Sequence, residues 1–191
     1  MTAMTATSLS KIFATAALAA GCALAQAGTL AINPTSSVVN VGDDFTISVI
    51  GTGFSEIVVG GGFNMRFDPT MLRYSAAASS IAPVWEFVPS LGTETTVSAS
   101  LHTLTDVSFS SFVNSPTGNF AVATIGFKVL QGGVSALALA PSAFFDFSDN
   151  AANILTPTST GGQVTAVPET GTLALLVTGL VALSPLTRRR A

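Results

Sequence analysis

Apolar and polar residues alternate with a period of two through the middle of this chain. The clearest runs are 45–49, 63–67, 97–101 and 107–109, in which every second residue is apolar. Successive side chains of a β-strand point to opposite faces, so the pattern predicts strands with one buried and one wet face. No stretch of this region carries the i, i+3, i+4 pattern of a long helix.

Further short strands are predicted where briefer apolar runs occur, at 56–59, 120–129, 137–139, 145–147 and 161–166. The apolar parity switches within the second of these, which predicts a β-bulge near Ala123 and Thr124. Turn-forming residues separate the strands, at 40–43, 51–53, 68–69, 114–118 and 131–133. Asp68 is expected to form an Asx-type turn with Pro69 after it. About nine short strands at this spacing predict an all-β sandwich or jelly roll.

Residues 1–27 have the features of a secretory signal peptide. Lys11 supplies a positive charge, an apolar stretch follows, and Ala25 and Ala27 are the small residues that signal peptidase requires. Cleavage after Ala27 would remove Cys22, the one cysteine, and leave no thiol for a disulfide or a metal site. The alternatives are a retained membrane anchor and lipidation at Cys22.

The C-terminal segment 167–191 combines a short motif, an apolar stretch and a basic end. The motif is Val167-Pro168-Glu169, the uncharged stretch 172–187 predicts a transmembrane helix, and Arg188, Arg189 and Arg190 follow. By the positive-inside rule the arginines stay in the cytoplasm, so the folded domain lies on the far side of the membrane.

This order of features resembles the PEP-CTERM sorting signal of Gram-negative bacteria. The resemblance implies recognition by an exosortase, a membrane protease-transferase. It further implies transient anchoring in the inner membrane, then release to the cell surface or the medium. Thr170 stands where the signal has its second proline. A simple C-terminal anchor with the same topology is the alternative.

Residues 28–166, between the two end segments, form one predicted domain, and several of its landmarks resemble cohesin domains. These are 41–47, the run 62–72 with its Phe-Asp-Pro, and 120–129, which occur in the cohesin order. The resemblance implies a nine-stranded jelly-roll sandwich that binds proteins through one sheet face. Cohesins proper capture dockerin modules, but no residue of this chain identifies a dockerin-binding face.

Charge excludes one class of partner. Only 9% of all residues are charged, and between residues 28 and 167 nine acids stand against three bases (Arg66, Arg73 and Lys128), a net charge of about −6. Nucleic-acid binding needs clustered Lys and Arg to neutralise phosphates, so we do not expect it.

Few residues offer catalytic chemistry. His102 is the single histidine, no G-x-S-x-G elbow occurs, and Glu86 and Glu94 show no paired spacing that would indicate a glycosidase. We therefore interpret the chain as non-enzymatic, with a hydrolase as the least favoured alternative, and His102 as a structural residue.

Four aspartates are candidates for calcium ligands, and no other cofactor is predicted. They lie in two loops, as Asp43-Asp44 and as Asp146 and Asp149. Carboxylate oxygens are the hard ligands that calcium prefers. The alternative is that these side chains solvate turns and cap strand ends.

Trp85 and Tyr74, with Phe87 beside the former, are candidates for a sugar-stacking platform. The segment 83–89 is apolar on both parities and could be an edge strand with an exposed patch, with packing in the core or a loop as the alternative. The sequence thus predicts an exported, non-enzymatic surface or matrix protein that binds proteins or polysaccharide. A carbohydrate-binding module is the second hypothesis.

Overall fold

The computed structural model describes residues 28–168 and Gly171. The predicted signal peptide, Glu169, the predicted helix 172–187 and the three arginines lie outside the described residues. Within the described part of the chain, no helix is long and apolar enough to cross a membrane. The described strands are β1 (Thr29–Asn33), β2 (Ser36–Asn40), β3 (Asp44–Phe54), β4 (Val58–Phe67), β5 (Leu72–Ile81), β6 (Thr93–Ser98), β7 (Leu101–Ser110), β8 (Gly118–Val129), β9 (Gly133–Pro141), β10 (Phe147–Asp149), β11 (Ile154–Leu155), β12 (Thr158–Thr160) and β13 (Gly162–Val167).

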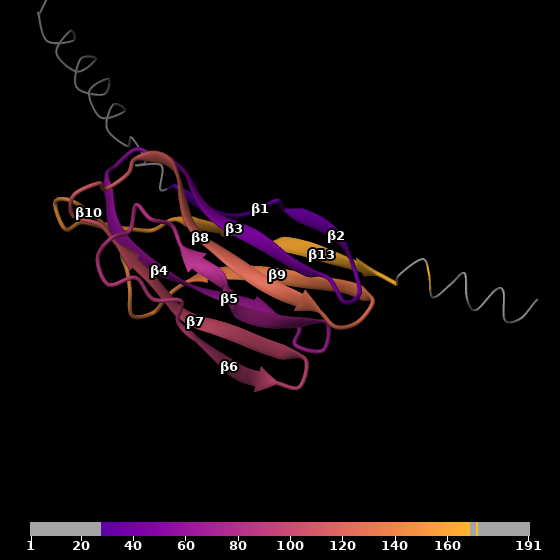
Figure 1. The fold of residues 1–191 in the computed structure, drawn as a ribbon. Helices are drawn as coiled ribbons and strands as arrows, with labels where there is room; N and C mark the ends of the chain where they lie inside the picture. The colour runs from indigo at the N-terminus through magenta and orange to yellow at the C-terminus, as the bar shows by residue number, and fades with distance from the viewer. Residues whose placement is uncertain (1–27, 169–170, 172–191) are drawn as a thin grey trace, which may run out of the picture.

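These strands form two stacked sheets, and the prediction of an all-β sandwich is confirmed (Figure 1). One sheet has the order β12-β1-β3-β8-β5. The other has eight strands in which β11-β10-β4-β9-β13-β2 follow one path, β7 pairs with β4, and β6 pairs with β7. The pairs β1–β12 and β2–β13 are parallel, and the other pairs are antiparallel.

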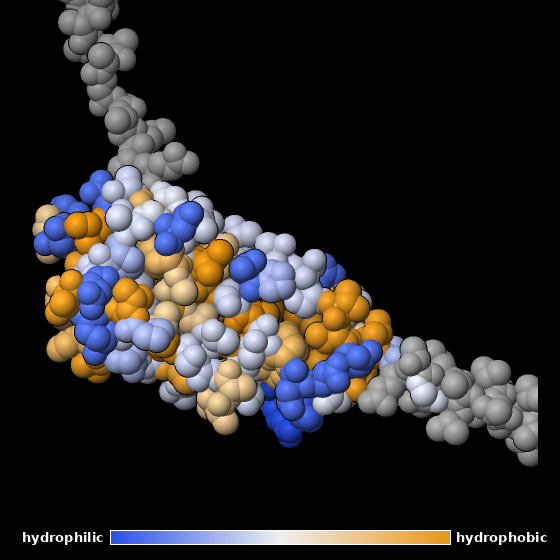
Figure 2. Space-filling model, turned by 45° about the horizontal axis from the view of Figure 1, so that its top comes forward, coloured by the Kyte–Doolittle hydropathy of each residue, from blue (hydrophilic) through white to orange (hydrophobic). Residues whose placement is uncertain are grey.

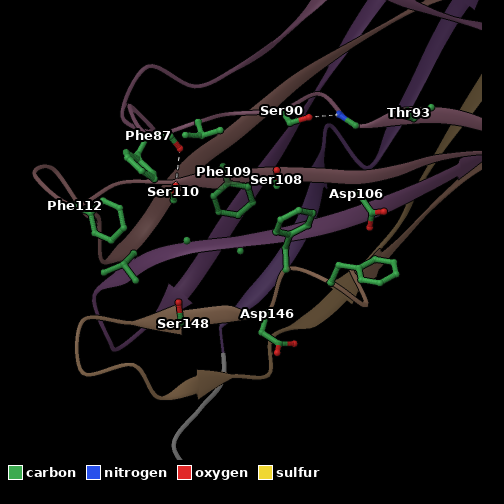
Figure 3. Close-up of a pocket in the computed structure, with 17 residues that line it drawn as sticks. Phe87, Ser90, Thr93, Asp106, Ser108, Phe109, Ser110, Phe112, Asp146 and Ser148 are labelled. Atoms are coloured by element: carbon green, nitrogen blue, oxygen red, sulfur yellow. Dashed lines mark hydrogen bonds between the residues drawn. The ribbon is translucent and has the colours of Figure 1, made fainter.

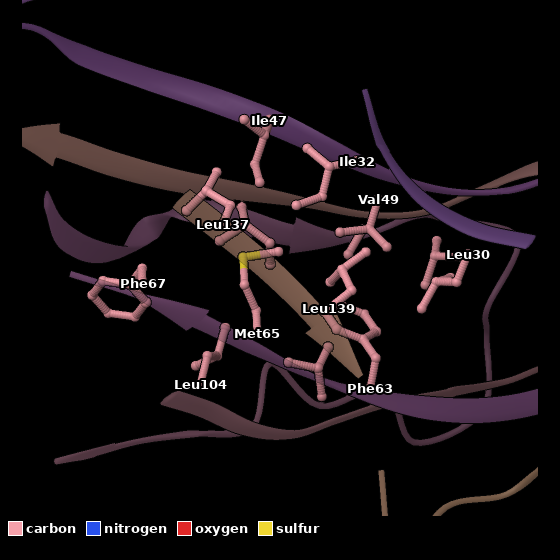
Figure 4. Close-up of a cluster of buried hydrophobic side chains, with 14 of the residues drawn as sticks. Leu30, Ile32, Ile47, Val49, Phe63, Met65, Phe67, Leu104, Leu137 and Leu139 are labelled. Carbon is pink, nitrogen blue, oxygen red and sulfur yellow. The ribbon is translucent and has the colours of Figure 1, made fainter. Parts of the chain in front are cut away.

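The core lies between the sheets and is built from the inward positions of the alternating strands (Figure 4). The five-stranded sheet contributes, among others, Leu30, Ile32, Ile47 and Val49, and the eight-stranded sheet contributes Phe63, Met65, Phe67, Leu104, Leu137 and Leu139. Burying one such side chain is worth roughly 1.5–3 kcal/mol relative to leaving it exposed. The period-two pattern therefore has the energetic weight to set which face of each strand points inward.

Three predicted boundaries are wrong. The predicted break at 51–53 does not end the strand: β3 continues to Phe54, although its pairing with β8 is irregular between Gly51 and Phe54, and Gly53 has a φ of 69°. Gly51 lies against the ring of its cross-strand partner Phe120, which would be 2.4 Å from a Cβ at this position. The predicted strand 97–101 is instead the tip of the β6–β7 hairpin, with its turn at residues 99–100. The predicted edge strand 83–89 is a loop.

Two local predictions are confirmed in position or nearly so. Asp68 accepts a hydrogen bond from the backbone N–H of Thr70 at 2.8 Å, which is the Asx turn expected there. The bulge in β8 falls at Val122, because Ala121 and Ala123 pair with consecutive residues of β3. It thus lies one residue before the predicted place.

Candidate functional site

A groove with a volume of about 920 Å³ lies on the outer face of the eight-stranded sheet (Figure 3). Strands β4 and β7 form its floor. The loop between β5 and β6 forms one wall with the loop after β7, and the loop between β9 and β10 forms the other. The walls thus come from segments that are far apart in the sequence, and the two sheets hold them in place.

The floor is made of the smallest side chains. Gly60 of β4 and its partner Ser110 of β7 line the groove with Ser108, and this row points away from the core. Gly62, the partner of Ser108, continues the row beneath the β9–β10 loop. Gly62 allows the β9–β10 loop to approach closely, because a Cβ there would lie 2.7 Å from the Cβ of Phe145. A row of small residues keeps the floor flat and lets the walls stand above it.

Phenylalanine side chains dominate the walls. Phe112 and Phe144 are 67% and 79% exposed, although both are large apolar residues. Phe87 lies beside Phe112, with ring centroids 5.0 Å apart in an edge-to-face arrangement, and Phe145 stands on the opposite wall. Exposed apolar side chains gathered on one hollow are typical of interaction sites.

Glu86 fastens the two loops that carry Phe87 and Phe112. Its Oε1 accepts hydrogen bonds from the backbone N–H groups of Phe112 and Val113, both at 3.0 Å. The Ser111 hydroxyl and these N–H groups stabilise the carboxylate and lower the pKa of Glu86 to about 2. The side chain is therefore an anion over the whole physiological range.

Ser142 fastens the opposite wall. Its hydroxyl oxygen accepts hydrogen bonds from the N–H groups of Phe144 and Phe145, at 3.0 and 3.3 Å, and the hydroxyl donates a hydrogen bond to Asp106 Oδ1 at 2.8 Å. Asp106 has a φ of 58° at a bulge in β7, where its own N–H donates to the Asn64 side chain at 2.7 Å. The wall is therefore held to the sheet by side-chain hydrogen bonds.

The polar groups in the groove give it a negative charge. Asp106 and Asp146 both line it, and none of the described lining residues is basic. A second hollow of about 670 Å³ adjoins the first and shares Val59, Phe112 and Ser148 with it. The two hollows are therefore neighbours on the same surface, and the charged side chains that line them are acidic.

The predicted sugar-stacking platform is wrong for Trp85. Its side chain is only 2% exposed and packs edge-on against Phe120, so no ring face is free. Tyr74 is half-buried against Phe127, and burial raises the pKa of its hydroxyl. The structure does not bring Trp85 and Tyr74 together on a surface, because Trp85 packs into the core.

The four predicted calcium ligands are dispersed among separate roles. Asp43 accepts a hydrogen bond from the N–H of Asn40, Asp44 pairs with Lys128 at 3.4 Å, and Asp146 lines the groove. Asp149 accepts hydrogen bonds from Ala151, from the backbone of Asn153 and from its side-chain amide, all at 2.7–2.8 Å. Among the described residues no three acids or histidines are grouped to hold a metal.

His102 has neighbours that the sequence did not reveal. Its Nδ1 lies 2.6 Å from Glu94 Oε1, and its Nε2 lies 3.2 Å from the Thr96 hydroxyl. The order acid, imidazole, hydroxyl is that of a hydrolase triad. All three nevertheless lie on the β6–β7 hairpin and line neither of the two hollows described above.

The structure describes only the start of the predicted sorting motif. Val167 ends β13, where its carbonyl accepts a hydrogen bond from the N–H of Val41 at 2.9 Å, and Pro168 is exposed. The predicted cleavage residues Ala25 and Ala27 lie outside the described residues.

Sequence reasoning missed the groove as a site. The sequence pattern singled out Phe87 only as a neighbour of Trp85, and it placed Phe145 in a short predicted strand. The available signal was the pairs 112–113 and 144–145, where large apolar residues interrupt polar turn segments.

No family model matches this chain, and no curated protein matches it. Solved structures do. The sixth cohesin of scaffoldin B from Acetivibrio cellulolyticus, in complex with a mutant Cel5 dockerin, has a TM-score of 0.57 at 16% identity and covers 73% of this chain and 99% of its own. The cohesin CaCohA2 of Clostridium acetobutylicum has a TM-score of 0.57 at 16% sequence identity, and the match covers 74% of this chain and 92% of that cohesin. A non-cellulosomal cohesin from the archaeon Archaeoglobus fulgidus has a TM-score of 0.51 at 15% sequence identity, and the match covers 77% of this chain and 96% of that cohesin. The described domain therefore has the cohesin jelly-roll fold.

Proposed function

We propose that this chain is an exported, non-enzymatic interaction protein whose groove binds a segment of a partner protein. The observation that carries the proposal is the open groove itself, with its flat floor and exposed phenylalanine walls. Four exposed phenylalanine rings in one hollow lower the solubility of a free monomer, and a bound partner would cover them (Phe87, Phe112, Phe144 and Phe145). The residues Asp106 and Asp146 favour a partner segment that carries lysine or arginine beside its apolar side chains.

The sheet next to the groove favours a protein partner as well. The outward positions of β9 are small as well, Ala136, Ala138 and Ala140, while the alternate positions Leu137 and Leu139 are buried. Asn64 and the exposed Arg66 of β4 lie opposite Ala140 and Ala138. A strand face of small side chains of this kind can meet another protein surface closely. Among the solved structures with this fold, one is a cohesin bound to a dockerin, which supports protein binding as the use of the scaffold.

The ends of the chain extend the proposal to its location. Signal peptidase would release the chain after Ala27, and an exosortase would act near Val167-Pro168-Glu169 after the helix 172–187 has anchored the chain. The protein would then reach the surface of a Gram-negative cell or its extracellular polysaccharide. Because β13 ends at Val167, the folded domain stops where this processing would occur.

A site-specific crosslinking experiment tests the groove. A photoreactive phenylalanine analogue is placed at Phe112 or Phe144 in the native host, and at Val97 of β6 as a control of similar exposure, 61%. We expect discrete protein adducts from positions 112 and 144 and none from position 97. Equal labelling at all three positions, or no adduct at any of them, would contradict the proposal.

Affinity then identifies which side chains matter. With the crosslinked partner in hand, Phe144→Ala should weaken binding by about 1–3 kcal/mol, as expected for an aromatic anchor, while Val97→Ala leaves it unchanged. Retention of the same variants on the host's polysaccharide serves as the competing test. A loss there, with no protein adduct, would favour the carbohydrate-binding hypothesis instead.

A further inference from the structure

A second apolar surface lies at the opposite end of the sandwich from the groove. It consists of Val38, Leu130 and Val134, which are 74%, 42% and 56% exposed and are here named the exit patch. Figure 2 shows hydrophobic surface gathered at this end of the molecule, beside the point where the described chain ends. The proposed function does not use this surface.

Strand register places two of the patch residues in one row. Thr165 of β13 pairs with Val38 of β2 on one side and with Val134 of β9 on the other. Val164 and Ala166, the neighbours of Thr165, are buried in the core, so the row points outward. Outward positions of a solvent-facing sheet are ordinarily polar. Val38 and Val134, on either side of Thr165, instead leave apolar surface in water that contact with an apolar partner would bury.

The chain leaves the domain at this patch. Val167 is bonded to Val41 in the turn after β2, and the glycine turn between β8 and β9 lies beside Pro168, with a Cβ at Gly132 only 3.7 Å from the proline ring. Leu130 stands in the same turn, where its N–H donates to the Met71 carbonyl at 2.8 Å. The patch residues therefore lie on the strands and the turn beside which the C-terminal tail begins.

The tail is too short to hold the patch far from a membrane. Three residues, 169–171, separate Pro168 from the start of the predicted helix 172–187. An extended chain spans at most about 3.5 Å per residue, so Pro168 stays within roughly 14 Å of the first residue of that helix. Such a short tether gives the patch a high effective concentration at the bilayer surface.

The charges at this end do not supply the attraction. Asp44 is paired with Lys128, whose ammonium also donates to the Gly42 carbonyl at 3.0 Å, and Asp43 caps its own turn. Arg73 is exposed. Because acidic and basic side chains nearly balance at this end of the domain, its contact with a bilayer depends on the aliphatic side chains and not on attraction to anionic lipids.

We propose that the exit patch rests in the interfacial region of a phospholipid bilayer while the helix 172–187 anchors the chain. This inference relies on the membrane anchoring of the proposed function. It holds the end of the sandwich that carries the C-terminal tail at the bilayer, and it leaves the groove, at the other end of the same sheet near the start of β4, farther from the tail. A partner could then be bound before the protein is released.

Environment-sensitive labels on the exported full chain test the orientation. The chain, with Cys22→Ser in the precursor, is purified in detergent and reconstituted into phosphatidylcholine vesicles. Single cysteines labelled with a nitrobenzoxadiazole dye replace Val134, Val113 or Val177. Val113 is a matched valine near the groove, 82% exposed, and Val177 reports insertion of the predicted helix.

We expect spin-labelled lipids to quench the fluorescence of the dye at positions 177 and 134 and to leave it unchanged at position 113. The emission maximum of the dye at position 134 should also lie at a shorter wavelength than it does in detergent-free buffer. Quenching at 177 without quenching at 134 would overturn the exit-patch inference and leave the anchoring intact. No quenching at 177 would overturn the anchoring and the inference with it. A second label, at Val38, should repeat the result at 134, and its failure to do so would refute contact through the row.

Discussion

The indole N–H of Trp85 donates a hydrogen bond to the backbone carbonyl of Ala121, with 2.9 Å between Nε1 and the oxygen. This bond joins the β5–β6 loop to β8, and therefore joins the groove wall to the opposite sheet. The ring itself fills space against Phe109, with centroids 4.6 Å apart. A residue that resembled a surface ligand-binding aromatic is thus the anchor of the wall that carries Phe87.

Trp85→Ala should lower the free energy of unfolding by about 3–5 kcal/mol, because it leaves a cavity in the core. Trp85→Phe keeps most of the ring packing and should cost less, about 1–2 kcal/mol, mainly from the lost hydrogen bond. Urea denaturation followed by circular dichroism measures both. Equal, small effects of the two variants would show that the indole is not packed as described.

The hydrogen bonds that the Glu86 carboxylate accepts from Phe112 and Val113 should be lost in acid. Because the folded pKa of about 2 lies below the ordinary 4.5, its contribution to stability is complete above pH 4.5 and is lost as the pH falls through about 2. The amide resonances of Phe112 and Val113 should titrate with an apparent pKa near that lower value. In Glu86→Gln the same two resonances should show no such step, and a step that persists in this variant would assign the titration to another group.

Gly62→Ala should disturb the far wall of the groove. The new Cβ would meet the Cβ of Phe145 at 2.7 Å and the carbonyl of Val107 at 2.9 Å, so the loop or the strand must shift. We expect a loss of about 1–3 kcal/mol in unfolding free energy and weaker partner binding. Gly132→Ala is the control, since its nearest neighbour is 3.6 Å away; comparable losses in both variants would argue against a special close approach at Gly62.

The Glu94–His102–Thr96 arrangement should not hydrolyse esters. Neither hollow includes these residues, and catalysis of acyl transfer depends on donors placed around the developing oxyanion in a water-excluded site. Hydrolysis of p-nitrophenyl acetate by the chain should equal that by His102→Ala. A rate that falls by an order of magnitude in the variant would instead establish a catalytic role for the histidine.

Calcium should leave the melting temperature unchanged, because the Asp149 carboxylate is already occupied by its own turn. The Asn153 side chain and backbone lower the pKa of Asp149, and its oxygens accept three hydrogen bonds at 2.7–2.8 Å. Asp149→Ala should lower the melting temperature with or without calcium. A rise on adding calcium to the unaltered chain that disappears in this variant would restore the calcium hypothesis.

Local pattern sufficed for part of the fold. The alternation at 45–49 and 63–67 predicts which residues enter the core, and Asp68 with Pro69 predicts its own turn, because both depend on neighbours in the chain. β5 was not predicted, since its register shifts between Ser75 and Ser80 and small exposed residues replace the alternation there. A glycine pair at 51–53 predicts a turn equally well whether or not an aromatic ring lies across from it.

The sequence by itself determined that this protein is an all-β sandwich, because side-chain alternation is a local property with enough hydrophobic free energy behind it. The signal peptide and the sorting signal at its two ends stay predictions from the sequence. Only the tertiary structure decided that Trp85 is buried, that loops as distant as those of Phe87 and Phe144 enclose one groove, and that Val38 and Val134 share a row. These relationships arise from strand register and from which loops meet at one end of a sheet, and neither is encoded by the spacing of residues along the chain.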